Sequence, residues 1–312
     1  MSVTVVGSLA YDAVRTPFGQ RDRMLGGAAT HFALAASLFD QVRIVGPVGE
    51  DFADADFDVL ATRGTIIDDV DVVAGGTTFF WRGEYGWDLN SRETLDTQLG
   101  VFEHFEPRLS RAARECDVLF LANIVPALQA AVLDQVVRPR WTALDSMNLW
   151  IDVARDDLLA VIERVDCLVL NDAELRQLTG KPSIAGAARE VLSIGPTSVV
   201  AKQGEYGAVL VTNEGFFSMP AYPLESVIDP TGAGDTFAGG LVGYVAANIG
   251  APVDHDLLAT ATAYGTAVAS FNVQEFGTER VTRLSFEEVQ LRVSELHRMT
   301  QFRHPVVERN LA

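Results

Sequence analysis

The chain has 312 residues, of which 48% are hydrophobic and 21% are charged, so it can bury a full core and is not a disordered chain. Its net charge is −18, from 24 Lys and Arg against 42 Asp and Glu, which argues against nucleic acid or an anionic membrane surface as a partner. No apolar run reaches the roughly 18 residues that a membrane-spanning helix requires.

The N-terminal residues predict a strand and not a signal peptide. The apolar run from Val3 to Val6 has no basic region before it, and a signal peptide would need one. The two cysteines, Cys116 and Cys167, have apolar neighbours and no metal-ligand spacing. We therefore expect buried free thiols, which suit a reducing cytoplasm.

Asp12 follows the first predicted strand, where an α/β sheet gathers its ligands. It is a candidate to bind substrate hydroxyls, and the alternative is a carboxylate that only forms a turn. Residues 11–24 then predict a short hairpin. An apolar helix follows to residue 38, opening with Gly26-Gly27.

A strand at 42–45 and a helix at 57–62 lead to a second stretch of β pattern at 66–85. We expect residues 66–85 and 11–24 to form one small sheet that stands off the main body. Its aromatic residues either stack on a substrate ring or pack within the sheet and against a partner. They are Phe79, Trp81 and Tyr85.

From residue 118 onward, strands alternate with helices. Strands are predicted at 118–121, 141–144, 167–170 and 198–201. This pattern indicates parallel β-α-β units in a doubly wound sheet, and right-handed crossovers bring the carboxyl ends of the strands to one edge. We expect one α/β domain over residues 1–312, with a mostly parallel sheet flanked by helices.

Polar residues follow these strands. Asn123 and Asp145 each come directly after one, and Asn171 and Glu174 open the helix after the strand at 167–170. Their amide and carboxylate oxygens suit Mg²⁺, while Asn at a helix start with Glu three residues later is also the capping-box pattern. The same two residues can bind Mg²⁺ and cap the helix at once.

The stretch from Asp229 to Phe237, Asp-Pro-Thr-Gly-Ala-Gly-Asp-Thr-Phe, joins a glycine loop to a carboxylate and a helix. Gly232 and Gly234 free the backbone, and successive amides at a helix start bind anions. Asp235 beside such a site suits a base that deprotonates a hydroxyl during phosphoryl transfer, and its place at a helix start predicts a low pKa. The stretch indicates a kinase, although Gly-x-Gly before Asp-Thr is also a common helix cap.

This stretch resembles the second signature of the PfkB (ribokinase-like) family of sugar and nucleoside kinases, Asp-Thr-x-Gly-Ala-Gly-Asp-x-Phe, with Pro230 in place of the usual Thr. Gly26-Gly27 is similar to the first signature, residues 171–174 to an Asn-x-x-Glu motif, and residues 202–207 to a Lys-x-Gly-x-x-Gly motif. The resemblance covers roughly residues 3–280.

The resemblance implies a ribokinase-like fold whose small sheet is a lid over the substrate and often a dimer surface. It also implies Mg²⁺ and ATP, with Asn171 and Glu174 at the metal and Asp235 as base beside an anion hole formed by Gly232, Ala233 and Gly234. The residues implied on the ATP side are Asn171, Lys202, Gly204, Gly207, Thr231 and Asn272.

On the substrate side, the resemblance implies Asp12, Gly26 and Gly27, whose glycines let the substrate press against the backbone. His31 stands where the family usually has an Asn that contacts a substrate hydroxyl; a lone His on a buried helix is otherwise a core residue. Trp81 and its neighbours could accept a base.

The sequence favours a small sugar or polyol as acceptor, phosphorylated on a primary hydroxyl. The alternatives are a ribonucleoside kinase of the adenosine type and a non-catalytic module that binds a nucleotide or metabolite. The intact set of Asp235, Asn171 and Glu174 argues against the last, since a binder has no use for a base. Two further expectations are a monovalent cation beside ATP and Mg²⁺, and a homodimer formed through the lid.

Overall fold

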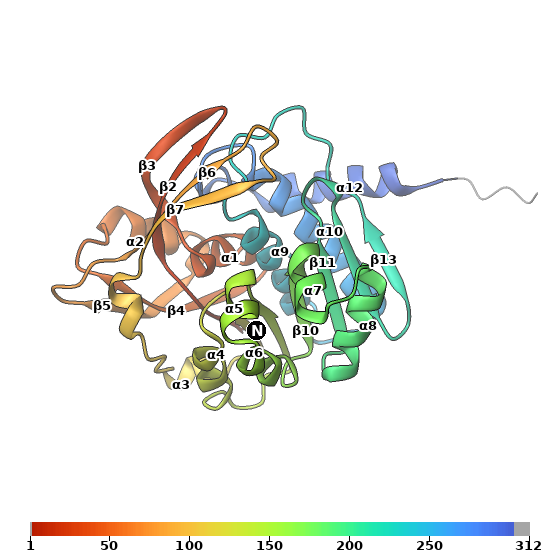
Figure 1. Ribbon diagram of the computed structural model, residues 1–312, viewed down its shortest axis with the longest axis horizontal. Helices are drawn as coiled ribbons and strands as arrows, with labels where there is room; N and C mark the ends of the chain where they lie inside the picture. The colour runs from red at the N-terminus through yellow and green to blue at the C-terminus, as the bar shows by residue number, and fades with distance from the viewer. Residues whose placement is uncertain (1, 303–312) are drawn as a thin grey trace, which may run out of the picture.

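The structure is a computed structural model that describes residues 2–302 (Figure 1). Residue 1 and residues 303–312, which the expected domain includes, lie outside this described range.

A nine-stranded sheet forms the main body, in the order β13-β12-β11-β10-β9-β8-β1-β4-β5. Every neighbouring pair from β11 to β5 is parallel, whereas β12 runs antiparallel to both β11 and β13. The strands are β1 (Ser2–Val6), β4 (Gln41–Gly49), β5 (Ile66–Val73), β8 (Val118–Leu121), β9 (Trp141–Asp145), β10 (Cys167–Asn171), β11 (Ser198–Lys202), β12 (Ala208–Thr212) and β13 (Phe216–Met219). The strand order reverses between β1 and β8, and such a switch point is where an α/β sheet binds ligands.

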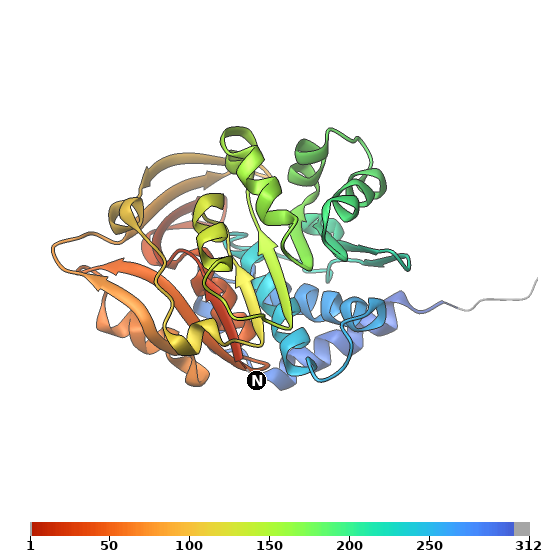
Figure 2. The ribbon, with the colours of Figure 1, turned by 90° about the horizontal axis from the view of Figure 1, so that it is seen from below.

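Helices cover both faces of this sheet (Figure 2). They are α1 (Ala28–Ala36), α2 (Asp54–Leu60), α3 (Arg111–Arg114), α4 (Pro126–Leu133), α5 (Asn148–Val153), α6 (Arg155–Ile162), α7 (Asp172–Thr179), α8 (Ile184–Ile194), α9 (Ala233–Ala247), α10 (His255–Asn272), α11 (Glu279–Thr282) and α12 (Phe286–Thr300). Strand side chains alternate between the faces: Val5 and Phe120 pack with α1, α9 and α10, while Val6 and Leu121 pack with α4 and α6 to α8. The expected doubly wound architecture is confirmed.

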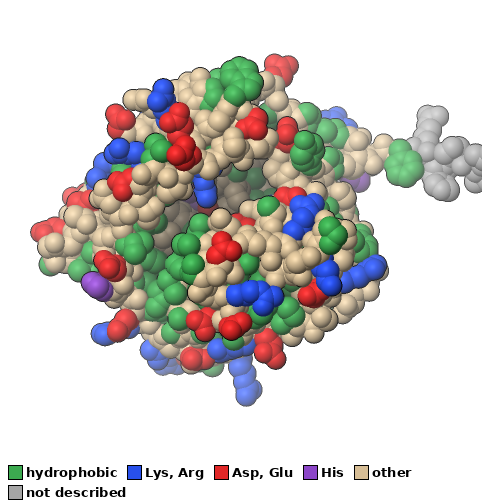
Figure 3. Space-filling view, viewed as in Figure 1, with side chains coloured by type: hydrophobic (Ala, Val, Ile, Leu, Met, Phe, Trp, Pro, Cys, Tyr) green, Lys and Arg blue, Asp and Glu red, His purple; other side chains and the backbone are tan. Residues whose placement is uncertain are grey.

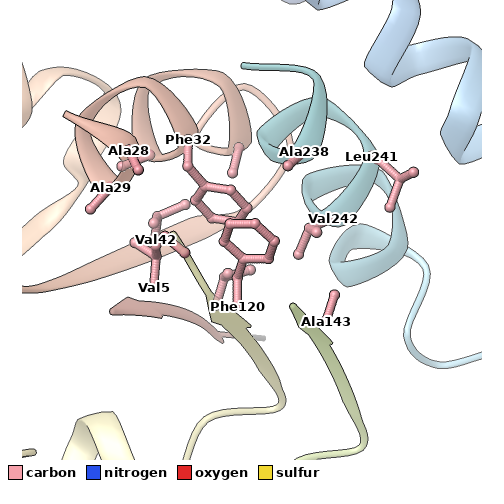
Figure 4. Packing of buried hydrophobic residues seen from close by; sticks show 14 of the residues in the cluster. Val5, Ala28, Ala29, Phe32, Val42, Phe120, Ala143, Ala238, Leu241 and Val242 are labelled. Carbon is pink, nitrogen blue, oxygen red and sulfur yellow. The ribbon is translucent and has the colours of Figure 1, made fainter. Parts of the chain in front are cut away.

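Helices α1 and α9 pack closely against each other. The ring of Phe32 on α1 stacks on Phe120 of β8, with centroids 4.2 Å apart (Figure 4). A β-carbon on Gly239 of α9 would lie 2.4 Å from the carbonyl oxygen of Phe32, so only glycine permits this approach. The starts of both helices are thereby held together above the switch point.

The small sheet has the order β3-β2-β6-β7 and differs from the prediction in one strand. Its strands are β2 (Ala10–Thr16), β3 (Gly19–Gly26), β6 (Phe79–Tyr85) and β7 (Arg92–Gln98). β5, expected in this sheet, instead extends the main sheet alongside β4, because an alternating pattern does not name its partner strand. No strand was predicted where β7 lies, since its mostly exposed polar side chains carry no hydrophobic pattern.

Cys116 and Cys167 are buried free thiols, as predicted. Within residues 2–302, no helix combines the length and apolarity that crossing a membrane requires.

Arg63, between α2 and β5, ties together segments distant in sequence. Its guanidinium donates hydrogen bonds of 2.6 to 3.1 Å to four backbone carbonyls, those of Leu34, Val281, Thr282 and Leu284. We expect Arg63→Met to lower the free energy of unfolding by about 2–4 kcal/mol, because buried acceptors lose a charged donor. Urea unfolding measures the change.

Arg111→Met is the matched control. Arg111 is exposed and pairs with Glu115 along the same helix, a contact worth about 0.5 kcal/mol or less. Equal losses in the two variants would contradict the structural role of Arg63.

Candidate active site

Four charged side chains meet where the strands of the main sheet end and α9 begins. Asp12 is in β2, just after β1, Asp145 ends β9, Lys202 ends β11, and Asp235 lies in the first turn of α9. Lys202 Nζ is 2.7 Å from Asp145 Oδ2, and a β-carbon on Gly234 would lie 3.2 Å from the same Nζ. The space-filling view shows this face hollowed below the small sheet (Figure 3).

The glycine loop leads into α9 as predicted. Gly232 caps the helix with a φ of 72°, a left-handed conformation that favours glycine. The amide of Ala233 donates to the carbonyl of Pro230 at 3.2 Å, so this member of the expected anion hole is already engaged. The amides of Gly234 and Asp235 follow in the first turn, where helix amides have no intrahelical acceptor.

Asp229 and Asn272 clamp the loop from beneath. The fully buried carboxylate of Asp229 accepts hydrogen bonds from the amides of Thr231 and Gly277, both at 2.9 Å. Asn272 is also fully buried; its Nδ2 donates to the Thr231 carbonyl at 2.8 Å and its Oδ1 accepts from the Thr236 hydroxyl at 3.0 Å. The Asn272 side chain therefore holds the loop, because both of its polar ends are engaged there, and the expected contact of Asn272 with ATP stays a prediction.

His31 lies directly behind the loop. A β-carbon on Gly232 would sit 2.4 Å from three atoms of the His31 ring, so the ring packs flat against that glycine. Within the described residues neither ring nitrogen has a hydrogen-bond partner. Burial lowers the pKa of His31 to about 4 against the opposing charge of Asp229, which leaves a neutral ring at pH 7. His31 supports the loop, and its contact with a substrate stays a prediction.

Asp12 is buried against the glycine pair. A β-carbon on Gly26 would lie 2.0 Å from Asp12 Oδ2, and one on Gly27, whose φ is 97°, would lie 2.5 Å from the carbonyl oxygen of Ser8. A side chain at Gly27 would meet the backbone and one at Gly26 would meet the Asp12 carboxylate, and the expected approach of a substrate to these glycines stays a prediction. Burial, with the charges of Asp229 and Asp235, raises the pKa of Asp12 to about 7.

The remaining acids surround Lys202. Burial raises the pKa of Asp145 to about 6 although Lys202 opposes the shift. The pKa of Asp235 is also raised, by removal from water, against the pull of Lys202. The low pKa expected for Asp235 is therefore wrong, because desolvation outweighs its place at a helix start.

Asn171 and Glu174 form the capping box of α7. Asn171 Oδ1 accepts from the Glu174 amide at 2.8 Å, and Glu174 Oε2 accepts from the Asn171 amide at 3.0 Å. Within residues 2–302, no three His, Cys, Asp or Glu side chains are grouped so that they could hold a metal ion. The Glu174 carboxylate suits Mg²⁺ that takes its other ligands from phosphates and water, and the metal role stays a prediction.

Gly204 and Gly207 shape the turn after β11. Their φ angles are 56° and 98°, and a β-carbon on Gly207 would lie 2.0 Å from the carbonyl oxygen of Met219. Both glycines are required by the turn itself, and their expected contact with ATP stays a prediction.

The small sheet turns one face toward this site. Asp12 pairs with Trp81, and Tyr85 pairs with Arg92, so each pair shares a face of the sheet. The Tyr85 hydroxyl accepts a hydrogen bond from the Thr231 hydroxyl at 3.2 Å, which identifies this face as the inner one. Arg92 was missed because its polar stretch carries no periodic signal; only the pairing of β6 with β7 brings it here.

The raised pKa of Asp12 predicts a pH-dependent stability. Above pH 4 the unfolded chain ionises Asp12 while the folded chain keeps it protonated to about pH 7, so Asp12 destabilises the fold increasingly over that range. Asp12→Asn should therefore gain stability between pH 5 and pH 8, by up to about 4 kcal/mol at pH 8. Thermal unfolding at both pH values measures this.

The control is Asp134→Asn, since Asp134 is exposed and pairs at the surface with Arg164. An Asp12→Asn shift of the same size at pH 5 and pH 8 would contradict the prediction.

Comparison with known proteins assigns the family. The model of the pfkB family carbohydrate kinases matches residues 102–283. A cytidine kinase of Thermococcus kodakarensis is 30% identical over 254 residues, which are 78% of this chain and 88% of the relative.

Solved structures show the fold. A Burkholderia thailandensis nucleoside kinase in complex with ADP-inosine has a TM-score of 0.77 at 20% identity and covers 94% of this chain and 95% of its own. An aminoimidazole riboside kinase from Salmonella enterica, complexed with aminoimidazole riboside and an ATP analogue, has a TM-score of 0.73 at 19% identity. The match covers 94% of this chain and 100% of that structure's chain. The fold is ribokinase-like, and the protein belongs to the PfkB family of carbohydrate kinases, as an ATP-dependent phosphotransferase with an alcohol acceptor.

Proposed function

We propose that the protein transfers the γ-phosphate of ATP to the primary hydroxyl of a ribonucleoside or a related riboside. The sequence favoured a free sugar or polyol, and the family includes both classes of acceptor. The observation that carries the proposal is the pairing of Asp12 with Trp81 on the inner face of the small sheet. A carboxylate for sugar hydroxyls thereby stands beside an aromatic ring for a base.

The ring of Trp81 is well suited to stacking. It lies along its own strand over Gly83, where a β-carbon would be 2.2 Å from the ring, and its Nε1 donates to the Thr94 hydroxyl at 3.3 Å. A ring held in this way loses little freedom when a base binds. The three relatives described above, which are named for cytidine, nucleosides and aminoimidazole riboside, support the same class.

Asp235 serves as the base in this proposal. The acceptor hydroxyl loses its proton to the Asp235 carboxylate, and its oxygen forms a bond to the γ-phosphorus. The bond from that phosphorus to the β–γ bridging oxygen breaks, and ADP leaves with the electron pair. The raised pKa of Asp235 makes it a stronger base than an exposed Asp, and the amides at Gly234 and Asp235 stabilise the phosphoryl oxygens.

The nucleotide occupies the edge between β10 and β11. Lys202 contributes a buried positive charge there, whose pKa Asp145 and Glu174 keep raised although burial opposes it. Gly204 and Gly207 border the nucleotide, and Asn171 and Glu174 would hold Mg²⁺. The metal would supply charge neutralisation on the phosphates.

Asp235→Asn tests the base. We expect turnover of cytidine or inosine with Mg-ATP to fall about 100-fold or more, while ADP binding changes little, because the amide keeps the shape of the carboxylate but takes up no proton. Coupled ADP release across nucleosides, sugars and polyols measures turnover and the acceptor class together.

Asp256→Asn is the matched control, an exposed Asp in the first turn of α10, and it should keep wild-type turnover. If the Asp235→Asn enzyme turns over at the wild-type rate, Asp235 is not the base.

Trp81→Leu tests the acceptor class. Base–aromatic stacking contributes about 1–3 kcal/mol per base, so KM for a nucleoside should rise about tenfold or more while KM for ribose stays unchanged. Trp87→Leu is the control, because Trp87 is 86% exposed at the tip of the β6–β7 hairpin. Equal changes in KM for the nucleoside and for ribose would favour a free sugar as the acceptor.

Three coarser features complete the proposal. Exposed apolar residues of the small sheet, Phe18, Trp87 and Leu95, support a homodimer through that sheet, which light scattering tests. The buried free thiols support a location of the protein in the cytoplasm, which cell fractionation tests. A monovalent cation rests on the family alone, and turnover in potassium against tetramethylammonium salts tests it.

A further inference from the structure

The cleft holds more negative charge than its main-sheet residues balance. Asp145 and Asp235 lie around it together with Asp12, whose pKa of about 7 leaves it partly ionised at neutral pH, and Lys202 is already paired with Asp145 at 2.7 Å. ATP would add its phosphate charges next to these carboxylates. Because like charges in a desolvated cleft repel strongly, transfer to an acceptor beside Asp12 and Asp235 calls for another cation.

Arg92 is placed to be that cation. It begins β7 opposite Tyr85, so its side chain leaves the inner face of the small sheet beside the Tyr85 ring. Its guanidinium carbon lies 5.4 Å from the centre of the Trp81 ring. Through Trp81 and Tyr85 the group is directed toward Asp12 and the glycine loop, and its charge lowers the pKa values of both Asp12 and Asp235.

The hairpin that carries Arg92 spans the cleft. Its turn is held by Asp88 Oδ1, which accepts from the amides of Asn90 and Ser91 at 3.1 and 3.2 Å. From this turn Asn90 Nδ2 donates to Glu205 Oε1 at 3.2 Å, and Glu205 lies in the turn after β11. The hairpin therefore links the small sheet to the turn after β11, two residues before Arg92 in the chain.

We propose that Arg92 is a catalytic residue that the small sheet supplies to the reaction, binding the oxygens of the γ-phosphoryl group as it passes to the acceptor. This inference rests on the proposed function and adds a residue to it. Arg92 forms no covalent bond and transfers no proton. It stabilises the charge on the phosphoryl oxygens, which arginine does well because its planar fork binds two oxygens at once.

Arg92→Gln and Arg92→Lys test the proposal with Mg-ATP and cytidine or inosine. We expect kcat to fall about 100-fold or more in Arg92→Gln, as for loss of an oxyanion donor, and by less in Arg92→Lys, which keeps the charge. KM for the acceptor should stay within about threefold, because the contact is made to the moving phosphoryl group. Added guanidinium ion should restore part of the kcat of an Arg92→Ala enzyme, which a structural role would not allow.

The matched control is Arg82→Gln. Arg82 is an exposed arginine on the neighbouring strand β6, over the Phe80 ring at 5.6 Å, and this variant should keep wild-type kcat. Thermal unfolding and ADP binding of the Arg92 variants should match the wild type, since Arg92 is exposed.

The outcomes separate this inference from the function beneath it. If Asp235→Asn abolishes turnover but Arg92→Gln keeps kcat within about threefold, the inference alone is overturned. A rise in KM with unchanged kcat also overturns it, because Arg92 would then only bind the acceptor. If no acceptor is turned over by the wild type, or Asp235→Asn has no effect, the proposed function fails and takes this inference with it.

Discussion

The two hydrogen bonds that buried Asp229 accepts hold the glycine loop before α9 in one conformation. A buried carboxylate is tolerated only when its oxygens are satisfied, and here the amides of Thr231 and Gly277 satisfy them. Those amides belong to the loop and to the turn after α10, so the carboxylate joins two segments that share no sheet. His31 fills the space behind Gly232, so the loop has no room to move backward. The start of α9 is rigid as a result, and a rigid set of amides stabilises a transferring group without reorganising.

This arrangement brings several carboxylates close together and removes them from water, which is electrostatically unfavourable. Burial raises the pKa values of Asp12, Asp145 and Asp235, so the cluster of carboxylates is electrostatically unfavourable, as functional sites often are. Lys202 offsets part of it from the main sheet. Arg92 offsets another part from the small sheet, with a side chain that lies on an exposed strand. One cation is thus fixed by burial, and the other stands on the element that faces the substrate.

Much of the architecture follows from local patterns in the sequence. The alternating strands and helices after residue 118, the glycine loop before α9, and the capping-box pattern of Asn171 and Glu174 were all predicted, and the structure confirms each. The small sheet was predicted with one wrong strand, because β5 has the alternation of a strand but nothing in it specifies β4 as its partner. Among the site residues, Asp12 and Asp235 were identified from their places after a strand and at a helix start.

The sequence by itself therefore determined the mostly parallel sheet and the glycine loop with Asp235, because backbone preference and short-range spacing encode both, and its motifs resemble those of the PfkB family. Only the tertiary structure decided that Asn272 holds the loop, that His31 lies against Gly232, and that Arg92 faces the site. It also reversed the pKa expected for Asp235. Each of these depends on contacts between residues far apart in the chain, and on water excluded by the packed molecule, which no local pattern of residues records.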